Sequence, residues 1–232
     1  MKPHEIILML SAMSIEAAGT RTRLWTAARW WHGATAMVAA ASLVAQFVII
    51  LSDGNDNTTV VRYFSFFTIQ SNILVCLTTA MLARRPDRDG AVYRVLRLDA
   101  VIGITVTGVV HYNVLRPLQN LTGWDQVCDI GLHIGVPVLA FVGWLAFGPR
   151  PRITARTVWL SLIFPIAWLV YTLFHGAFAD WYPYPFVDVD EHGVGRVLLN
   201  CALVAVLFTV CGALAHLADR KLPPAPRPSS EA

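Results

Sequence analysis

Six long apolar segments dominate this sequence and limit the folds that it can adopt. Each is about 20 residues long, the length that an α-helix needs to cross the hydrocarbon core of a bilayer. The segments occupy residues 31–51, 62–83, 95–115, 127–147, 157–178 and 195–217. Only 14% of the 232 residues are charged, whereas soluble domains carry about 25%. The sequence therefore predicts an all-α, polytopic membrane protein built as a bundle of six transmembrane helices.

Basic residues predict the orientation of the bundle, because cytoplasmic loops of membrane proteins are enriched in lysine and arginine. The N-terminal segment, the second and fourth connections and the C-terminal tail hold every lysine and arginine except Arg62, Arg116 and Arg196. Both termini are therefore predicted to be cytoplasmic, in a protein of the cell membrane. We expect residues 1–30 to form a cytoplasmic lead-in, residues 31–217 the transmembrane domain, and residues 218–232 a disordered, proline-rich cytoplasmic tail.

Neither the charge distribution nor the cysteines indicate a nucleic-acid partner, a disulfide or a cofactor. The basic residues lie beside the predicted spans instead of forming one patch, so membrane lipids are the expected partners and nucleic acid is not. The four cysteines form no CxxC pair, and most lie inside apolar segments, where cysteine behaves as a small hydrophobic residue. The sequence therefore predicts no cofactor and no metal ion, and it leaves the oligomeric state open.

One predicted span carries two ionisable residues a single helical turn apart. Asp129 and His133 lie near the outer end of segment 127–147, and ionisable groups inside a span are costly and usually functional. In the predicted orientation, further polar residues collect in the same outer half: Ser65, Thr68, Asn72, His111, Asn113, Tyr171 and His175. The pattern predicts a water-accessible cavity that opens outward or into the outer leaflet.

Nucleophilic catalysis is the first chemistry that this set of residues can support. The hydroxyl of Ser65 or Thr68 can be activated by His133, with Asp129 orienting the imidazole ring. A purely structural interpretation stands beside it. Serine and threonine in membrane helices often bond only a backbone carbonyl or a neighbouring helix.

Metal ligation and ion transport are two further possibilities. His111, His133 and His175 can ligate a metal ion or haem, although no HxxxH or HExxH spacing is present. Proton or ion transport along Asp129, His133 and Asn72 would need polar groups through the inner half as well. Such groups are sparse there, so transport is the less favoured interpretation.

Three short stretches resemble segments of a known family of membrane proteins. They are YFSFFTIQSN (63–72), DIGLHIGVPVL (129–139) and WYPYPFVDV (181–189). They resemble the threonine-bearing helix, the histidine helix and the Tyr-Pro-Phe segment of the androgen-induced membrane proteins and androgen-dependent TFPI-regulating proteins. Members of that family are multi-pass hydrolases of fatty acid esters of hydroxy fatty acids, and they use a threonine nucleophile with a histidine. The number and spacing of the spans also agree.

The resemblance implies roles for individual residues. His133 matches the catalytic histidine, and Ser65 falls on the nucleophile position, where the family has threonine. Asp129 replaces an amide residue and can support a triad. Thr68 lies one turn deeper, nearer the expected depth of His133, and is the alternative nucleophile. The implied function is a lipid ester hydrolase with Ser65, His133 and Asp129 as catalytic residues. The alternative is a non-enzymatic membrane protein that binds a lipid or lipophilic ligand in the same cavity.

The remaining polar residues are expected to line the pocket around the substrate. The predicted pocket residues are Thr68, Asn72, His111, Asn113, Tyr171 and His175. Hydrolysis also needs a donor that holds the oxyanion, and Asn72, Asn113 and Tyr112 are the candidates. The proline-rich segment 180–190 is expected to be either a rigid lid over the cavity or a stiff connector at the membrane interface.

Overall fold

The computed structural model describes residues 3–52 and 57–224, and the regular structure in this part of the chain is helical throughout. Five of its helices are long and apolar enough to cross a membrane. A bent pair, Thr58–Ser65 with Phe67–Arg84, adds a sixth span if the two are counted as one. The prediction of an all-α, multi-pass membrane protein is therefore confirmed. The cytoplasmic location of the termini stays a prediction, and residues 225–232 of the expected tail lie outside the described residues.

The described helices follow one another with short connections. In chain order they are α1 (Pro3–Ser52), α2 (Asn57–Ser65), α3 (Phe67–Arg84), α4 (Ala91–Val110), η1 (His111–Leu115), η2 (Arg116–Leu118), α5 (Gly123–Ile130), η3 (Gly131–Gly135), α6 (Val136–Phe147), α7 (Ala155–Ser161), α8 (Ile163–Ala179), η4 (Pro185–Val187) and α9 (Val189–Lys221).

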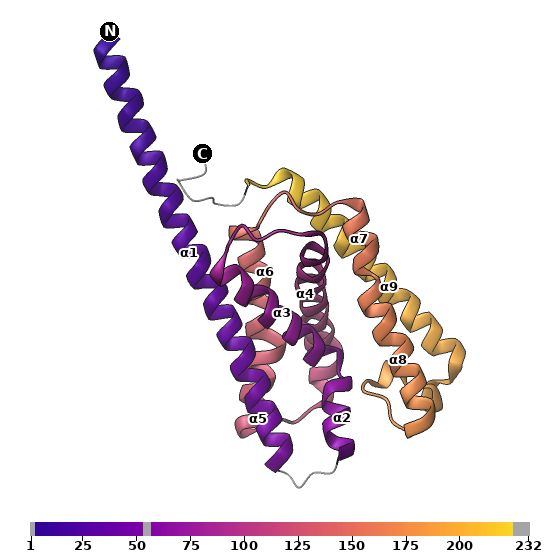
Figure 1. Ribbon diagram of the computed structural model, residues 1–232. Coiled ribbons are helices and arrows are strands. Elements are labelled where there is room, and N and C mark those ends of the chain that lie inside the picture. Colours follow the sequence, from indigo (N-terminus) through magenta and orange to yellow (C-terminus); the bar gives the residue numbers. More distant parts are fainter. Residues whose placement is uncertain (1–2, 53–56, 225–232) are drawn as a thin grey trace.

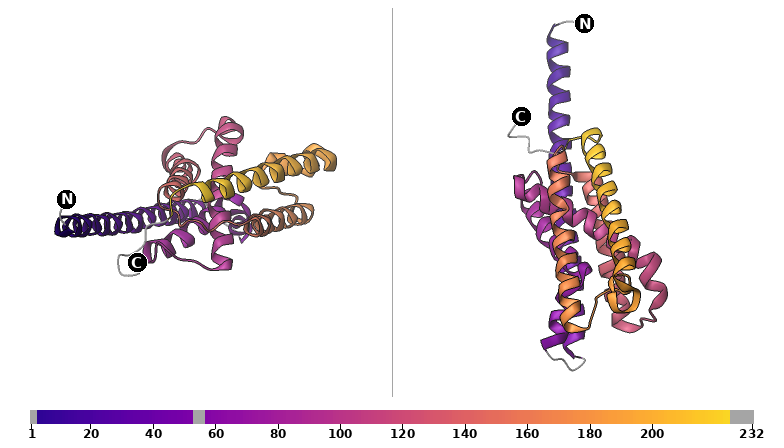
Figure 2. Two further views of the ribbon diagram at one scale, coloured as in Figure 1. Left: turned by 90° about the horizontal axis from the view of Figure 1, so that it is seen from above. Right: turned by 90° about the vertical axis from the view of Figure 1, so that its right-hand side faces the viewer.

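Two groups of helices make up the bundle. The first group consists of α1, α3, α4 and α6, which pack against one another. The second consists of α7, α8 and α9, of which α7 and α9 contact α4, and α8 and α9 stand on one side of the bundle (Figure 1). Helix α1 is 50 residues long, and its first half extends beyond the other helices (Figures 1 and 2). Because α1 is unbroken, residues 3–30 continue the first span as a single helix.

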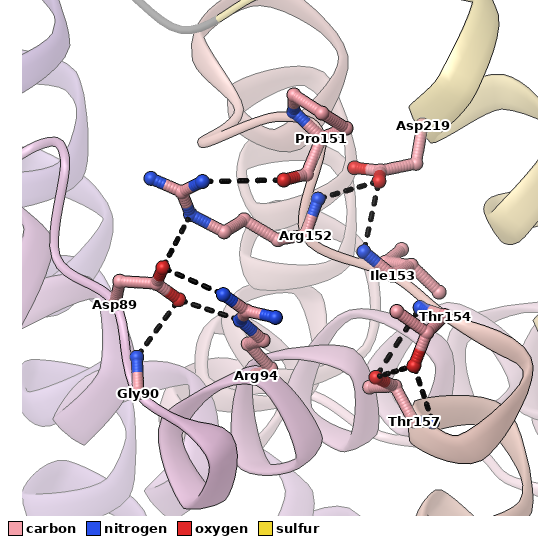
Figure 3. A network of polar contacts seen from close by, with 9 residues as sticks. All are labelled: Asp89, Gly90, Arg94, Pro151, Arg152, Ile153, Thr154, Thr157 and Asp219. Atoms are coloured by element: carbon pink, nitrogen blue, oxygen red, sulfur yellow. Dashed lines mark hydrogen bonds and ion pairs between the residues drawn. The ribbon is translucent and has the colours of Figure 1, made fainter.

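One end of the bundle, here called the basic end, holds the start of α1, the end of α9 and the connections after α3 and α6 (Figure 1). A polar network ties these connections together (Figure 3). Asp89 accepts hydrogen bonds from Arg94 at 2.6 and 2.7 Å and pairs with Arg152 at 3.3 Å. Buried Asp219 of α9 accepts the backbone N–H groups of Arg152 and Ile153 at 2.6 and 2.8 Å. The bonds from Arg94 lower the pKa of Asp89 to about 2.

A sharp break separates α2 from α3. Phe66 has extended backbone angles, φ −68° and ψ 129°, and the two helices meet at 67°. The next residue, Phe67, is buried against Trp168 of α8 and Phe208 of α9, with ring centroids 5.1 and 5.8 Å away. These ring contacts stabilise the bundle. They fix the first turn of α3, which carries Thr68, relative to α8 and α9.

Candidate functional site

Thr68, His133 and Asp129 form a line of polar contacts inside the helix bundle. The Thr68 hydroxyl oxygen lies 3.3 Å from His133 Nε2, and His133 Nδ1 lies 2.8 Å from a carboxylate oxygen of Asp129. Thr68 and Asp129 are both buried. When Nδ1–H donates to the carboxylate, Nε2 carries the lone pair that can accept the threonine proton. The order of nucleophile, base and carboxylate is that of a catalytic triad.

A second histidine shares the same carboxylate. His111 Nε2 lies 2.9 Å from Asp129, and its ring stacks on that of His133 with the centroids 3.6 Å apart and the planes 9° from parallel. Only 2% of His111 is exposed. Asp129 therefore serves two imidazoles, and its negative charge can compensate a positive charge that forms on His133. The sequence predicted the pair of Asp129 with His133 but not the contact with His111.

Both histidines lie in π-helical turns, η1 and η3, which are rare and often occur at functional sites. In η3 the sequence offers a cause. Pro137 has no N–H, so the His133 carbonyl lacks its usual donor four residues later. That carbonyl faces Gly108 of α4, where a Cβ would lie only 3.0 Å from the oxygen. Glycine at position 108 therefore allows α4 and η3 to come close, which lets the two imidazoles stack.

The amide and the hydroxyl of Thr68 both contact Tyr184. The Thr68 N–H donates to the Tyr184 hydroxyl at 3.2 Å, and the two hydroxyl oxygens also lie 3.2 Å apart. Thr68 is in the first turn of α3, where N–H groups lack helical acceptors and the helix dipole favours negative charge. Burial raises the pKa of the Tyr184 phenol, so that the hydroxyl keeps its proton. The Tyr184 hydroxyl thus accepts the Thr68 N–H and has its own proton to donate beside the threonine hydroxyl.

An apolar cavity with a volume of about 120 Å³ adjoins Thr68. Its walls come from α3, α4, α8, α9 and the η4 connection, and they include Leu169, Tyr184, Phe186 and Phe208. Because the walls are almost wholly hydrocarbon, the cavity suits an aliphatic chain rather than a polar ligand. Tyr184 and Phe186 belong to the proline-rich segment 180–190, which therefore packs against the cavity as part of its wall.

Ser65 lies before the break, on α2, and its contacts differ from those of Thr68. Its hydroxyl donates to the Val61 carbonyl at 2.8 Å and lies 2.7 Å from the Tyr171 hydroxyl. Among the described residues, the hydroxyl that contacts His133 is that of Thr68. The geometry therefore favours the alternative nucleophile over the one that the resemblance implies.

The predicted oxyanion donors have other contacts. The amide of buried Asn72 donates to the carbonyls of Thr68 and Leu132 at 2.9 and 3.3 Å. Asn113 is exposed and donates to a carbonyl of its own helix, and Tyr112 is 60% exposed. Sequence reasoning missed Tyr184. The available signal is its place in the Tyr-Pro-Phe segment, for which the sequence predicts a lid or a connector.

His111, Asp129 and His133 also form a set that can hold a metal ion, because their donor atoms all lie within 4.8 Å of one another. Imidazole and carboxylate are common zinc ligands. His175, which the sequence grouped with the other histidines, instead stacks on Tyr171 with the centroids 5.5 Å apart. An ion on His133 Nδ1 would replace the hydrogen bond to Asp129, so a metal site and a triad are alternative uses of the same atoms.

Comparisons with known proteins found no relative of this chain: no protein-family model, no curated protein and no solved structure matches it. The function is therefore inferred from the residues and their geometry, together with the resemblance of the three short stretches.

Proposed function

We propose that this chain is an integral-membrane lipid ester hydrolase of the fatty acid ester of hydroxy fatty acid type. Thr68 is the nucleophile, His133 the general base and Asp129 the carboxylate that orients the base. The observation that carries the proposal is the line of contacts from Asp129 through His133 to Thr68, which ends at the wall of an apolar cavity. The resemblance of residues 63–72 and 129–139 to a family with a threonine nucleophile and a histidine supports the type of reaction and His133 as the base, although it places the nucleophile at Ser65.

Acylation begins when the Thr68 hydroxyl oxygen attacks the ester carbonyl carbon and its proton passes to His133 Nε2. The negative charge of Asp129 stabilises the imidazolium. The tetrahedral intermediate then collapses, the bond to the alcohol oxygen breaks, and His133 returns the proton to that oxygen. The products of this half-reaction are the free hydroxy fatty acid and an acyl ester on Thr68.

Deacylation repeats these steps with water as the nucleophile. His133 Nε2 takes a proton from the water, whose oxygen attacks the acyl carbonyl, and then returns the proton to the Thr68 oxygen. The fatty acid leaves and the threonine hydroxyl is restored. The apolar cavity holds the acyl chain through both half-reactions, which brings the ester carbonyl to the start of α3.

The oxyanion that forms on the carbonyl oxygen needs donors that are already in position. The Tyr184 hydroxyl meets this need, because its oxygen lies 3.2 Å from the nucleophilic oxygen and the Thr68 N–H, which donates to it, holds it in place. The positive end of the α3 dipole adds to its effect. In the orientation predicted from the basic residues, the site lies in the outer half of the membrane and both termini are cytoplasmic.

The test is hydrolysis of a fatty acid ester of a hydroxy fatty acid by the purified protein in detergent. Thr68→Ala and His133→Ala should each lower kcat by about 10³-fold or more, because each removes a member of a unit that acts together. Ser65→Ala is the matched control. It removes a buried hydroxyl one turn away and should leave kcat within about tenfold of the wild type.

Folding of each variant is verified by its thermal unfolding midpoint. Full activity in Thr68→Ala, or loss of activity in Ser65→Ala alone, would contradict the assignment of the nucleophile. If the wild type binds the ester without turning it over, the cavity serves ligand binding, which is the alternative function from the sequence.

A further inference from the structure

Arg97 lies buried near the start of α4, at the opposite end of that helix from His111 of the proposed active site. The residue is 5% exposed, and none of its three guanidinium nitrogens has a hydrogen-bond partner among the described residues. Asp89, the acidic residue of the polar network at the basic end, is already paired with Arg94 and Arg152. A guanidinium that leaves water without an anion beside it loses a large solvation free energy. The unpaired state of Arg97 therefore indicates an anion that binds there.

Arg97 lines a small cavity at the basic end. The volume of this cavity is about 20 Å³, and Arg88, Arg94 and Arg152 line it as well. Figure 3 shows Arg94 and Arg152 on either side of Asp89, which balances one of these positive charges. Arg88 is exposed, whereas Arg97 is buried. Positive charge therefore extends from the surface of the protein to the inner wall of the cavity.

We infer that this cavity binds a phosphate group, with one oxygen inside against Arg97 and the others at the mouth beside Arg88. A volume of about 20 Å³ admits roughly one water-sized group, so a single phosphate oxygen enters. Guanidinium groups match phosphate oxygens in charge and in the spacing of their donors. The arginines that remain outside can contact the oxygens that do not enter.

Such a phosphate has two sources, the headgroup of an anionic phospholipid and free inorganic phosphate. Arg97 is six residues after Ala91, where α4 begins, which corresponds to about 9 Å along the helix axis. A residue at that distance from the end of a span lies close to the lipid headgroups. Basic residues at the cytoplasmic surface also attract anionic lipids. Both sources present the same chemistry to the site, and the experiment separates them.

The experiment measures the thermal unfolding midpoint of the purified full-length protein in detergent. Four additions are compared: phosphatidylglycerol, phosphatidylcholine, inorganic phosphate, and chloride at the ionic strength of the phosphate. The variants are Arg97→Gln and Arg156→Gln. Arg156 is exposed and also lies beside a connection of the basic end, so it is a matched control for the loss of one positive charge.

For the wild type we expect phosphatidylglycerol or inorganic phosphate to raise the midpoint by about 5 °C, with little effect of phosphatidylcholine or chloride. A rise with phosphatidylglycerol alone identifies the lipid as the source, and a rise with inorganic phosphate identifies the free anion. Arg97→Gln should lose most of the rise, which corresponds to about tenfold weaker binding or more. Arg156→Gln should keep it.

Three results would overturn the inference: an equal rise with chloride, no rise in the wild type, or an unchanged rise in Arg97→Gln. If Arg97→Gln does not fold, Arg88→Gln takes its place, because Arg88 is exposed at the mouth and its substitution leaves the interior intact. A reduced rise in Arg88→Gln supports the phosphate site, and a full rise contradicts it.

Discussion

The substitution Asp129→Asn tests whether one carboxylate serves both imidazoles. It keeps the size and shape of the side chain and removes the charge. The carboxylate lies 2.8 Å from His133 Nδ1 and 2.9 Å from His111 Nε2. An asparagine has one acceptor oxygen and one donor group in place of two acceptor oxygens. Both imidazole nitrogens lie closest to the same carboxylate oxygen, and an imidazole that the amide NH2 group faces must turn a lone pair, instead of its N–H, toward residue 129.

The size of the effect follows from these two contacts. If His133 offers the Nδ1 lone pair to the amide, its proton lies on Nε2 and it can no longer accept the proton of Thr68. In a serine-type triad the same change lowers kcat by about 10⁴-fold, which corresponds to about 5.4 kcal/mol of transition-state stabilisation. Each hydrogen bond to a charged group contributes about 1.5–3 kcal/mol to stability. With one such bond lost and the other weakened, we expect the free energy of unfolding to fall by about 2–4 kcal/mol.

The assay compares ester hydrolysis and denaturant unfolding of the wild type, Asp129→Asn and Asp125→Asn. Asp125 is the matched control, because it is exposed and lies one turn earlier on α5. Its substitution should change stability by less than about 0.5 kcal/mol. An Asp129→Asn protein with activity within about tenfold of the wild type would refute the role of the shared carboxylate, whatever its stability.

Three further substitutions test the supporting structure. Gly108→Ala would put a Cβ 3.0 Å from the His133 carbonyl oxygen. The resulting overpacking should lower the free energy of unfolding by about 1–3 kcal/mol and separate the stacked imidazoles, so that both stability and activity fall in unfolding and hydrolysis assays. Gly176→Ala would put a Cβ into the ring of Tyr182, so the segment that carries the oxyanion donor must shift; we expect a lower kcat with a smaller effect on KM. The pKa of Asp89 is lowered from 3.8 to about 2, so its ionised form stabilises the fold above about pH 4 and this contribution disappears as the pH falls toward 2. Asp89→Asn should therefore unfold at a lower temperature than the wild type at pH 7, and the difference should vanish near pH 2.

Gly19→Ala is the control for the two glycine substitutions, because no described atom beyond its chain neighbours and its own helix backbone lies within 4 Å of the added Cβ. It should leave the unfolding midpoint and the activity unchanged or slightly raised, since alanine favours a helix more than glycine does. If Gly108→Ala behaves like Gly19→Ala, close approach of α4 and η3 is not required. An Asp89→Asn midpoint that stays equal to the wild-type midpoint at pH 7 would show that the Arg94 contacts do not stabilise the fold.

The spans could be predicted from the sequence because each is a run of apolar residues of membrane-crossing length. The pair of Asp129 and His133 was equally accessible, since a spacing of four residues brings two side chains onto one helix face. His111 was placed in the same half of the membrane by counting residues along its span. Its contact with Asp129 depends on how closely α4 and η3 approach, which a single glycine decides and which no periodic pattern reveals.

The nucleophile and its donors were harder to predict because they depend on the bend at Phe66. Counting along a straight helix puts Thr68 nearer the depth of His133 but leaves Ser65, on the same helix face, as a second candidate. The bend directs the Ser65 hydroxyl to Tyr171 and leaves Thr68 in the first turn of α3. Likewise, Arg97 was counted from the sequence only as one of many basic residues near a loop. Its burial without a partner became visible once the helices around it were assembled.

The identity of the nucleophilic oxygen is the central claim, and a covalent adduct tests it most directly. The purified protein would be treated with a fluorophosphonate, and the modified peptide would be mapped by mass spectrometry in the wild type and in His133→Ala. We expect the adduct on Thr68 in the wild type and none in folded His133→Ala, because the hydroxyl is then not activated. An adduct on Ser65, or no adduct on a folded wild-type protein that hydrolyses the ester, would contradict the account.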